Sequence, residues 1–255
     1  MLIRSNILTL PVNILDLPKA IDEVVVLAQK KQPAYVCVSN VHMCMETYDD
    51  IEFHHIVNSA NLVVADGRPI FWAQRLLGYK DAKQVRGQDL MTELCAISGH
   101  KELNIGLYGG SSNNVLIKVV ENLTTAFPNI RICYHFSPPY SELTATQKIQ
   151  VVTDIKKANV DMLFVGIGCP KQERWMSVNS PEIPCVMLGV GAAFDFIAGE
   201  KRHAPKWMQK VGLEWFYRLL AEPKRLAVRY LKENPRFVYY FLLQLLKLKC
   251  NKLFS

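Results

Sequence analysis

Residues 162–173 read M-L-F-V-G-I-G-C-P-K-Q-E, an apolar run that passes through two glycines into a proline and three polar residues. The run Met162–Ile167 is typical of a strand buried on both faces. Glycine permits a sharp turn after such a strand, and proline suits the first position of a helix. The stretch therefore predicts a strand–turn–helix unit of a parallel sheet, with polar side chains at the carboxyl end of the strand, where such sheets bind ligands.

The same alternation of strands and helices runs through residues 1–199. Other short apolar runs are typical of strands: Tyr35–Ser39, Leu62–Ala65, Leu103–Tyr108, Ile130–Tyr134 and Cys185–Val190. Segments with the apolar spacing of helices lie between them: Leu17–Lys30, Leu90–Ser98, Val115–Phe127 and Ala145–Ala158. This alternation predicts an α/β fold with a mostly parallel sheet that is covered by helices on both faces.

The last fifth of the chain has a different character. From Glu200 onward it holds 13 Lys and Arg against 4 Asp and Glu, a net charge of +9, whereas residues 1–199 carry −2. Because prolines begin or end helices, we predict three helices in series, Trp207–Leu220, Pro223–Lys232 and Pro235–Lys249. The sequence has no flexible linker, so we expect one domain, a core of residues 1–199 that carries a helical C-terminal appendage of residues 200–255.

Composition excludes several classes of protein. Half of the residues are apolar and 21% are charged, as in globular proteins. No apolar stretch approaches the roughly 18–20 residues that span a bilayer, and the first residues do not form a signal peptide pattern. The seven cysteines are scattered without a C-x-x-C pair. We therefore expect reduced thiols in the cytosol, without a disulfide scaffold or a structural zinc site.

Polar residues and glycines follow several predicted strands. Gly109 and Gly110 open a helix, where backbone amides favour phosphate, although glycine turns are also common in ordinary connections. Lys171 and Gln172 suit a diphosphate or sugar hydroxyls, whereas Glu173 could merely complement the helix dipole. Asp66 follows a strand and could act as a general base, or its side chain could cap the Asp-Gly turn.

Phosphate handling would fall to cations of the protein, because the sequence has no D-x-D, no H-E-x-x-H and no Cys/His cluster. The lone His42 is more typical of a structural role. In the appendage Arg218, Arg225, Arg229 and Arg236 are 7, 4 and 7 residues apart and share one helical face, which favours an anionic partner over a solvated face. The apolar segment Phe237–Leu248, flanked by lysines, suits an anionic membrane surface, but also packing on the core or on a partner subunit.

These motifs, in this order, resemble the WecG/TagA/CpsF family, glycosyltransferase family 26. The resemblance rests on segments spread over nearly the whole chain: Asn40, Ala65-Asp66-Gly67, Arg86-Gly87-Gln88-Asp89-Leu90, Gly109-Gly110, Gly166-Ile167-Gly168-Cys169-Pro170-Lys171-Gln172-Glu173, Gly189-Val190-Gly191-Ala192-Ala193-Phe194-Asp195, Gly199, Arg202-His203-Ala204-Pro205, Gly212-Leu213-Glu214-Trp215-Phe216-Tyr217-Arg218-Leu219, Glu222-Pro223, Arg225-Leu226 and Arg229-Tyr230.

The resemblance implies a Rossmann-like α/β catalytic core with an appendage that completes the active site and contacts membrane. It implies an inverting hexosyltransferase that needs no metal or other cofactor. The enzyme would move N-acetylmannosamine, its uronic acid or glucose from a UDP-sugar onto a polyprenyl-diphosphate-linked sugar, in synthesis of bacterial cell-surface polysaccharide or teichoic acid. It would act as a peripheral protein on the inner face of the cell membrane, without nucleic acid as a partner. A homo-oligomer is left open.

Roles carry over to matching positions. Asp66 matches the general base, Asn40 and Gln172 match polar positions of the donor pocket, and Arg218 and Arg225 match arginines that meet diphosphate. Further substrate-binding residues are then expected at Arg86, Gly109, Gly110, Lys171, Asp195 and Arg229.

The chain departs from the family pattern at three positions. Val38 stands where a pocket threonine is usual, Gln84 where an arginine is usual, and Val228 precedes Arg229 where two arginines are usual. These departures affect donor choice more than reaction class. Two alternatives are a nucleotide-dependent oxidoreductase, which the missing G-x-G-x-x-G disfavours, and a non-catalytic membrane-associated scaffold.

Overall fold

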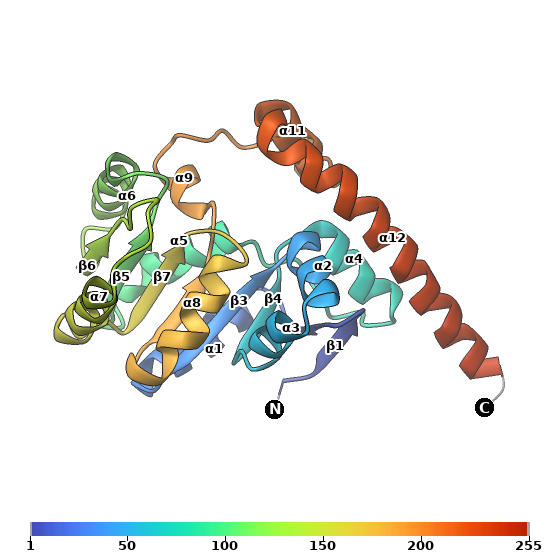
Figure 1. The fold of residues 1–255 in the computed structure, drawn as a ribbon, viewed down its shortest axis with the longest axis horizontal. Helices are drawn as coiled ribbons and strands as arrows, with labels where there is room; N and C mark the ends of the chain where they lie inside the picture. Colours follow the sequence, from blue (N-terminus) through green and yellow to red (C-terminus); the bar gives the residue numbers. More distant parts are fainter. Residues whose placement is uncertain (1, 254–255) are drawn as a thin grey trace.

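A computed structural model describes residues 2–253, except for the side chains of Lys210, Arg225, Lys252 and Leu253 (Figure 1). Its centre is a six-stranded sheet in the order β4-β3-β8-β7-β5-β6, in which every neighbouring pair is parallel. The strands are β3 (Ala34–Ser39), β4 (Leu62–Ala65), β5 (Asn104–Gly109), β6 (Arg131–Phe136), β7 (Met162–Gly166) and β8 (Val186–Gly189). All six predicted strands and the α/β fold class are thereby confirmed.

Alternation along the strands builds two apolar layers, one on each face of the sheet. In β3, Val36 and Val38 belong to one layer, while Tyr35 and Cys37 belong to the other. Helices of the first layer are α1 (Leu17–Gln29), α5 (Gly87–Ser98), α6 (Asn113–Ala126) and α9 (Ala193–Ile197). Helices of the second layer are α2 (Val41–Asp49), α3 (Ile51–Asn58), α4 (Arg68–Leu76), α7 (Ala145–Lys157) and α8 (Lys171–Asn179), which a 3-10 turn, η1 (Ser180–Glu182), follows.

An antiparallel hairpin, β1 (Arg4–Ile7) and β2 (Leu10–Asn13), was not predicted. Its strands are short, and distant residues hold it in place. Asn13 Oδ1 accepts a hydrogen bond from Val63 N in β4 at 2.8 Å, and Gln74 Nε2 in α4 donates to Ser5 Oγ at 3.0 Å. Because these partners are distant in sequence, the pattern of residues 4–13 alone does not predict the hairpin.

The appendage folds into α10 (Lys206–Lys210), α11 (Glu214–Ala221) and α12 (Pro223–Leu253). The predicted helix Trp207–Leu220 is wrong in that it breaks at Gly212, where φ is +78° and a side chain would collide with the Trp72 ring. The predicted break at Pro235 is also wrong, because α12 runs through it. Proline removes one backbone hydrogen bond within a helix, that to the carbonyl of Leu231. This residue is exposed, so water can donate a hydrogen bond to the carbonyl instead.

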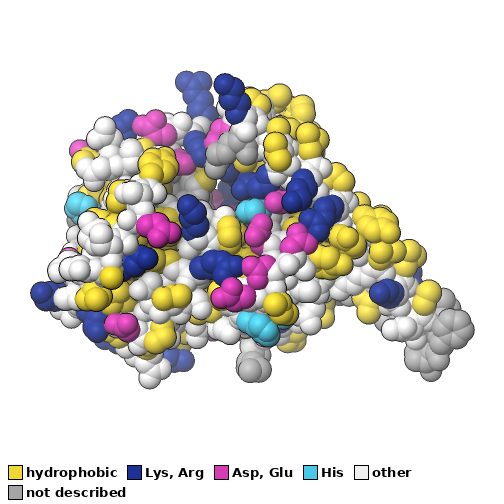
Figure 2. Space-filling model, viewed as in Figure 1, with side chains coloured by type: hydrophobic (Ala, Val, Ile, Leu, Met, Phe, Trp, Pro, Cys, Tyr) yellow, Lys and Arg dark blue, Asp and Glu magenta, His cyan; other side chains and the backbone are white. Residues whose placement is uncertain are grey.

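Two faces of α12 are apolar. Phe237 and Phe241 are buried in the second layer, with ring centroids 5.8 Å apart. On the outer side, Leu231, Val238, Leu242 and Leu246 are each more than half exposed and follow one another at 7, 4 and 4 residues. Figure 2 shows hydrophobic side chains along this outer edge, where the helix extends beyond the core. Among the described residues, no helix is long and apolar enough to cross a membrane.

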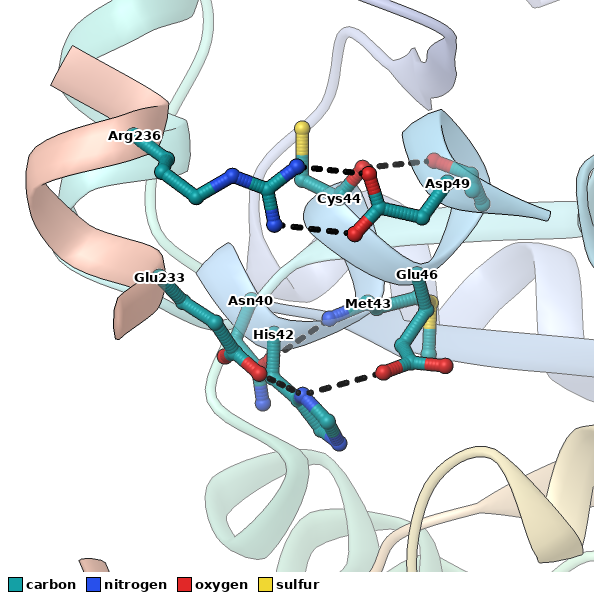
Figure 3. Close-up of polar contacts among 9 residues, drawn as sticks. Asn40, His42, Met43, Cys44, Glu46, Asp49, Glu233 and Arg236 are labelled. Atoms are coloured by element: carbon teal, nitrogen blue, oxygen red, sulfur yellow. Dashed lines mark hydrogen bonds and ion pairs between the residues drawn. The ribbon is translucent and has the colours of Figure 1, made fainter. Parts of the chain in front are cut away.

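Polar contacts fix the inner face of α12 to the core (Figure 3). Arg236 donates to both oxygens of Asp49 in α2 at 2.9 and 2.6 Å, and His42 Nδ1 lies 2.8 Å from Glu233 Oε1. Nearer the C-terminal end of α12, the side chain of Gln244 contacts the β1–β2 hairpin. It accepts a hydrogen bond from Leu8 N at 2.9 Å and donates one to Asn6 O at 2.8 Å. Arg236, predicted to face an anionic partner, is therefore engaged within the protein.

We expect Phe237→Ala to lower the free energy of unfolding by about 3 kcal/mol, because it leaves a cavity under α12. Urea unfolding followed by circular dichroism measures this loss. Val238→Ala, on the exposed side of the same turn, is the matched control and should stay within about 0.5 kcal/mol of the parent. Equal losses in both variants would mean that α12 is not seated on the core through Phe237.

Candidate active site

The carboxyl ends of five neighbouring strands meet at one edge of the sheet. In sheet order they present Asp66 after β4, Asn40 after β3, Gly191 after β8, Gly168 after β7 and Gly110 after β5. The backbone N–H groups of Asp66 and Gly67 both donate to Ser39 O, at 2.9 and 3.2 Å, which sets Asp66 beside the end of β3. Parallel pairing thus gathers the predicted site residues that follow strands along a single edge.

Asp66 is held by a distant partner and not by its own turn. Its Oδ1 accepts a hydrogen bond at 2.8 Å from the backbone N–H of Gly87, the first residue of α5. The pKa of Asp66 is raised to about 6, chiefly by burial. Glu214 adds to the rise, whereas the Gly87 hydrogen bond, Arg218 and Arg86 oppose it. A carboxylate with this pKa is ionised at neutral pH and still basic enough to take a proton, as a general base must.

A pocket lies beside Asp66, between the core and the appendage. Its volume is about 330 Å³, within the range of small-ligand sites, and it is lined by Arg68, Gln84, Arg86, Asp89, Lys206, Gln209 and Glu214. Gln84, which stands where the family pattern has arginine, lines it and donates to the backbone carbonyl of Asp66 at 2.6 Å. Sequence reasoning assigned no role to Arg68, Lys206, Gln209 or Glu214, although Arg68 directly follows the Asp-Gly turn.

Arg86 lies in this pocket with three of its N–H groups already engaged. Nε and Nη2 donate to the two carboxylate oxygens of Asp89 at 2.7 and 3.0 Å, and Nη1 donates to Gln209 Oε1 in α10 at 2.6 Å. The guanidinium therefore joins α5 to the appendage. Arg68 and Lys206 are further cations of the same pocket.

The appendage arginines differ in what they contact. Arg218 is partly buried, its guanidinium lies 5.9 Å from the ring centre of Phe196, and its charge acts on Asp66. In Arg218 and Arg229 alike, the buried Nε has no hydrogen-bond partner within residues 2–253. The side chain of Arg225 lies outside the described residues.

Asp195, another predicted substrate ligand, makes an internal ion pair. Lys201 Nζ lies 2.7 Å from Asp195 Oδ2 and 3.2 Å from Glu222 Oε1. Glu222 stands between α11 and α12, so Lys201 ties α9 to the corner of the appendage. The contact gives Asp195 a structural role next to the site.

Other predicted binding residues have structural roles in the turns. Asn40 Oδ1 caps α2 by accepting from Met43 N at 3.2 Å. Gly109 and Gly110 have φ of +142° and +95°, and a Cβ at Gly109 would come within 2.6 Å of the Gly166 backbone. Close approach of β5 to β7 therefore accounts for Gly109 without a ligand. Lys171 is exposed at the first residue of α8.

Glu173, for which the sequence indicated only a contact with the helix dipole, has a further contact in the structure. It lies in the first turn of α8, but its side chain is fully buried, and Gln172 Nε2 donates to its Oε1 at 2.6 Å. Burial raises the pKa of Glu173 to about 7. The position in the first turn agrees with a contact to the helix dipole, and the side chain in addition faces the protein interior beside Gln172.

One described cluster has the geometry to hold a metal ion. It consists of His42, Glu46 and Glu233, whose ligand atoms lie within 4.8 Å of one another (Figure 3). The distance of 2.8 Å between His42 Nδ1 and Glu233 Oε1 is that of a direct hydrogen bond. Its evident role is to join α2 to α12, in line with the structural interpretation of His42.

Comparison with known proteins agrees with this arrangement. Residues 5–251 match the model of the Glycosyl transferase WecG/TagA/CpsF family. The chain belongs to this family. A relative from Bacillus subtilis (strain 168), N-acetylglucosaminyldiphosphoundecaprenol N-acetyl-beta-D-mannosaminyltransferase, is 30% identical over 77% of this chain and 75% of its own length. A protein of the same name from Staphylococcus aureus (strain NCTC 8325 / PS 47) is 34% identical over 72% of this chain and 70% of its own.

The protein is thus a glycosyltransferase, as its motifs predicted, and both relatives transfer a hexosamine, in line with the predicted hexosyltransferase class. Because the family match covers residues 5–251, the alternatives of an oxidoreductase and of a non-catalytic scaffold are excluded.

Two charged side chains of α11, Glu214 and Arg218, act on the Asp66 carboxyl in opposite directions. We expect Glu214→Gln to lower the pKa of Asp66 and Arg218→Gln to raise it. A carbon-13 NMR titration of the Asp66 carboxyl reports both shifts. Glu182→Gln, an exposed change far along the chain, should leave the titration unaltered, and shifts of the same sign in the two α11 variants would contradict this placement.

Proposed function

We propose that the protein transfers a sugar from a UDP-sugar to a polyprenyl-diphosphate-linked sugar, with inversion and without a metal ion. The observation that carries the proposal is the Asp66 carboxyl, with a pKa raised to about 6, next to Gln84 and Arg86 of a pocket that is also lined by Arg68 and Lys206. The names of both relatives give an acceptor of this kind, N-acetylglucosaminyldiphosphoundecaprenol. The product would serve cell-surface polysaccharide or teichoic acid synthesis.

In this proposal the reaction is a single displacement. Asp66 takes the proton of the acceptor hydroxyl while that oxygen attacks the anomeric carbon, and the bond from this carbon to the UDP oxygen breaks. Attack on the face opposite the leaving group inverts the anomeric centre, so no covalent nucleophile is needed. Negative charge that develops on UDP meets Arg68, Lys206 and Arg218, which would act where other transferases use a divalent cation.

The first test is UDP release by the purified protein in EDTA. A panel of UDP-sugars is offered with a short-chain polyprenyl-diphosphate N-acetylglucosamine or glucose acceptor. UDP formed only with acceptor, and at the same rate with and without EDTA, supports the transfer and its metal independence together. Activity that returns only with a divalent cation would overturn the metal-free proposal while leaving the transfer intact.

Asp66→Asn should lower kcat by about 100-fold or more, because it removes the base and keeps the shape of the side chain. In the parent protein kcat should fall as the pH drops through about 6, since protonated Asp66 cannot accept a proton. Rate measurements between pH 4.5 and 8 check both. Asp89→Asn, which alters a carboxyl in the same pocket, is the control for a general charge effect. In this variant kcat should still fall as the pH drops through about 6.

We further propose that residues 200–255 form an appendage that completes the active site and binds the inner face of the cytoplasmic membrane. Support comes from the exposed apolar side of α12, formed by Leu231, Val238, Leu242 and Leu246, and from lysines beyond it (Figure 2). Apolar side chains with basic neighbours suit the headgroup zone of an anionic bilayer. At the membrane surface the active site could reach an acceptor that is linked to a lipid.

Truncation at Pro235 would remove the buried Phe237 and Phe241 as well, so point changes on the exposed side give a sharper test. We expect Leu242→Glu with Leu246→Glu to abolish co-sedimentation with phosphatidylglycerol vesicles, because two charges would enter the interface. Ile149→Glu, an exposed apolar position on α7, is the matched control and should bind as the parent does. Undiminished binding of the double variant would exclude α12 as the membrane contact.

A further inference from the structure

We propose that Glu173 is a positioning residue that fixes the side-chain amide of Gln172, so that Gln172 Oε1 accepts a hydrogen bond from an O–H or N–H group of the donor substrate. The inference rests on the proposed transferase function and assigns a task to a residue that does not itself touch substrate. It concerns the edge where β7 and β8 end.

Glu173 determines which way the amide of Gln172 points. Gln172 is 3% exposed and Glu173 is 0% exposed, and Nε2 of Gln172 donates to Oε1 of Glu173 at 2.6 Å. In its ionised form the Glu173 carboxyl only accepts hydrogen bonds, so the NH₂ group of Gln172 faces it and the amide oxygen points away. The reversed amide would bring two oxygens together inside the protein, where the repulsion is poorly screened.

The neighbouring glycines show where that oxygen points. A Cβ at Gly189 would lie 2.9 Å from Gln172 Nε2, so the NH₂ end is tightly packed. A Cβ at Gly191 would have a single described neighbour within 4 Å, Gln172 Oε1 at 3.8 Å. There is therefore room for one methyl-sized group beside this oxygen at Gly191, the second residue after β8.

Gln172 Oε1 is a buried acceptor without a hydrogen-bond partner in the described part of the chain. Buried polar atoms of native proteins nearly always have partners, and leaving one unpaired is costly. A substrate hydroxyl or amide N–H would satisfy this oxygen. A carboxylate could not, because it brings no proton and would face both this oxygen and Glu173 behind it.

The test is a double-mutant cycle on donor KM. Glu173→Gln keeps the shape but frees the amide of Gln172 to turn over, and Gln172→Met removes the acceptor oxygen. We expect each single variant to raise the donor KM about tenfold, since one hydrogen bond is lost, with a smaller change in kcat. Because Glu173 acts through Gln172, adding Glu173→Gln to Gln172→Met should bring no further rise.

Binding of UDP and of the UDP-sugar by calorimetry tells which part of the donor supplies the hydrogen-bond donor group. Weakening of both in Glu173→Gln places that group on the nucleotide, and weakening of the UDP-sugar alone places it on the sugar. The exposed Glu182→Gln is the control and should change neither. Additive effects of the two changes, or a donor KM unchanged in Glu173→Gln, would overturn the role of Glu173 while the transferase function stands. A parent protein that neither binds UDP-sugars nor releases UDP would instead refute the proposed function.

Discussion

One hydrogen bond, from the backbone N–H of Gly87 to the side-chain Oδ1 of Asp66, fixes the carboxylate of the site to the fold. It forms only because β4 pairs with β3, where Asp66 N–H is held by Ser39 O, and because α5 begins against the ends of β3 and β8. A side chain at residue 87 would come within 2.9 Å of Val38 Cγ1. Val38, which replaces a usual threonine, is thus part of the packing that lets Gly87 reach the carboxylate.

The basicity of Asp66 then depends on residues that are far away in sequence. Burial raises its pKa, and of the two α11 side chains that act on it, Glu214 adds to the rise and Arg218 counters it. Arg86 contributes from the core and also bonds Gln209 of α10. The position of the appendage and the protonation of the carboxyl are therefore linked, so any movement of α11 would change both.

Residues with local signals were predictable from the sequence. The six strands follow from short apolar runs, and the place of Asp66 at a strand end follows from the strand before it. What failed depends on distant contacts. Pro235 stays inside α12 because residues on both sides of it, Glu233 and Arg236, are bonded to α2. Nothing near Glu173 in the sequence indicates that its side chain turns inward to Gln172.

The arginines of the appendage show why spacing alone could not assign their tasks. Arg236 shares a helical face with the others in sequence, yet Asp49 satisfies it with two hydrogen bonds, and this pairing lowers the pKa of Asp49. Arg218 and Arg229 instead retain a buried Nε without a partner among the described residues. A cation that is already paired adds little attraction for a ligand, because its charge is compensated. Arg236 thus helps to seat α12 on the core, whereas in the proposed function Arg218 is the kind of less compensated charge that can act on a diphosphate.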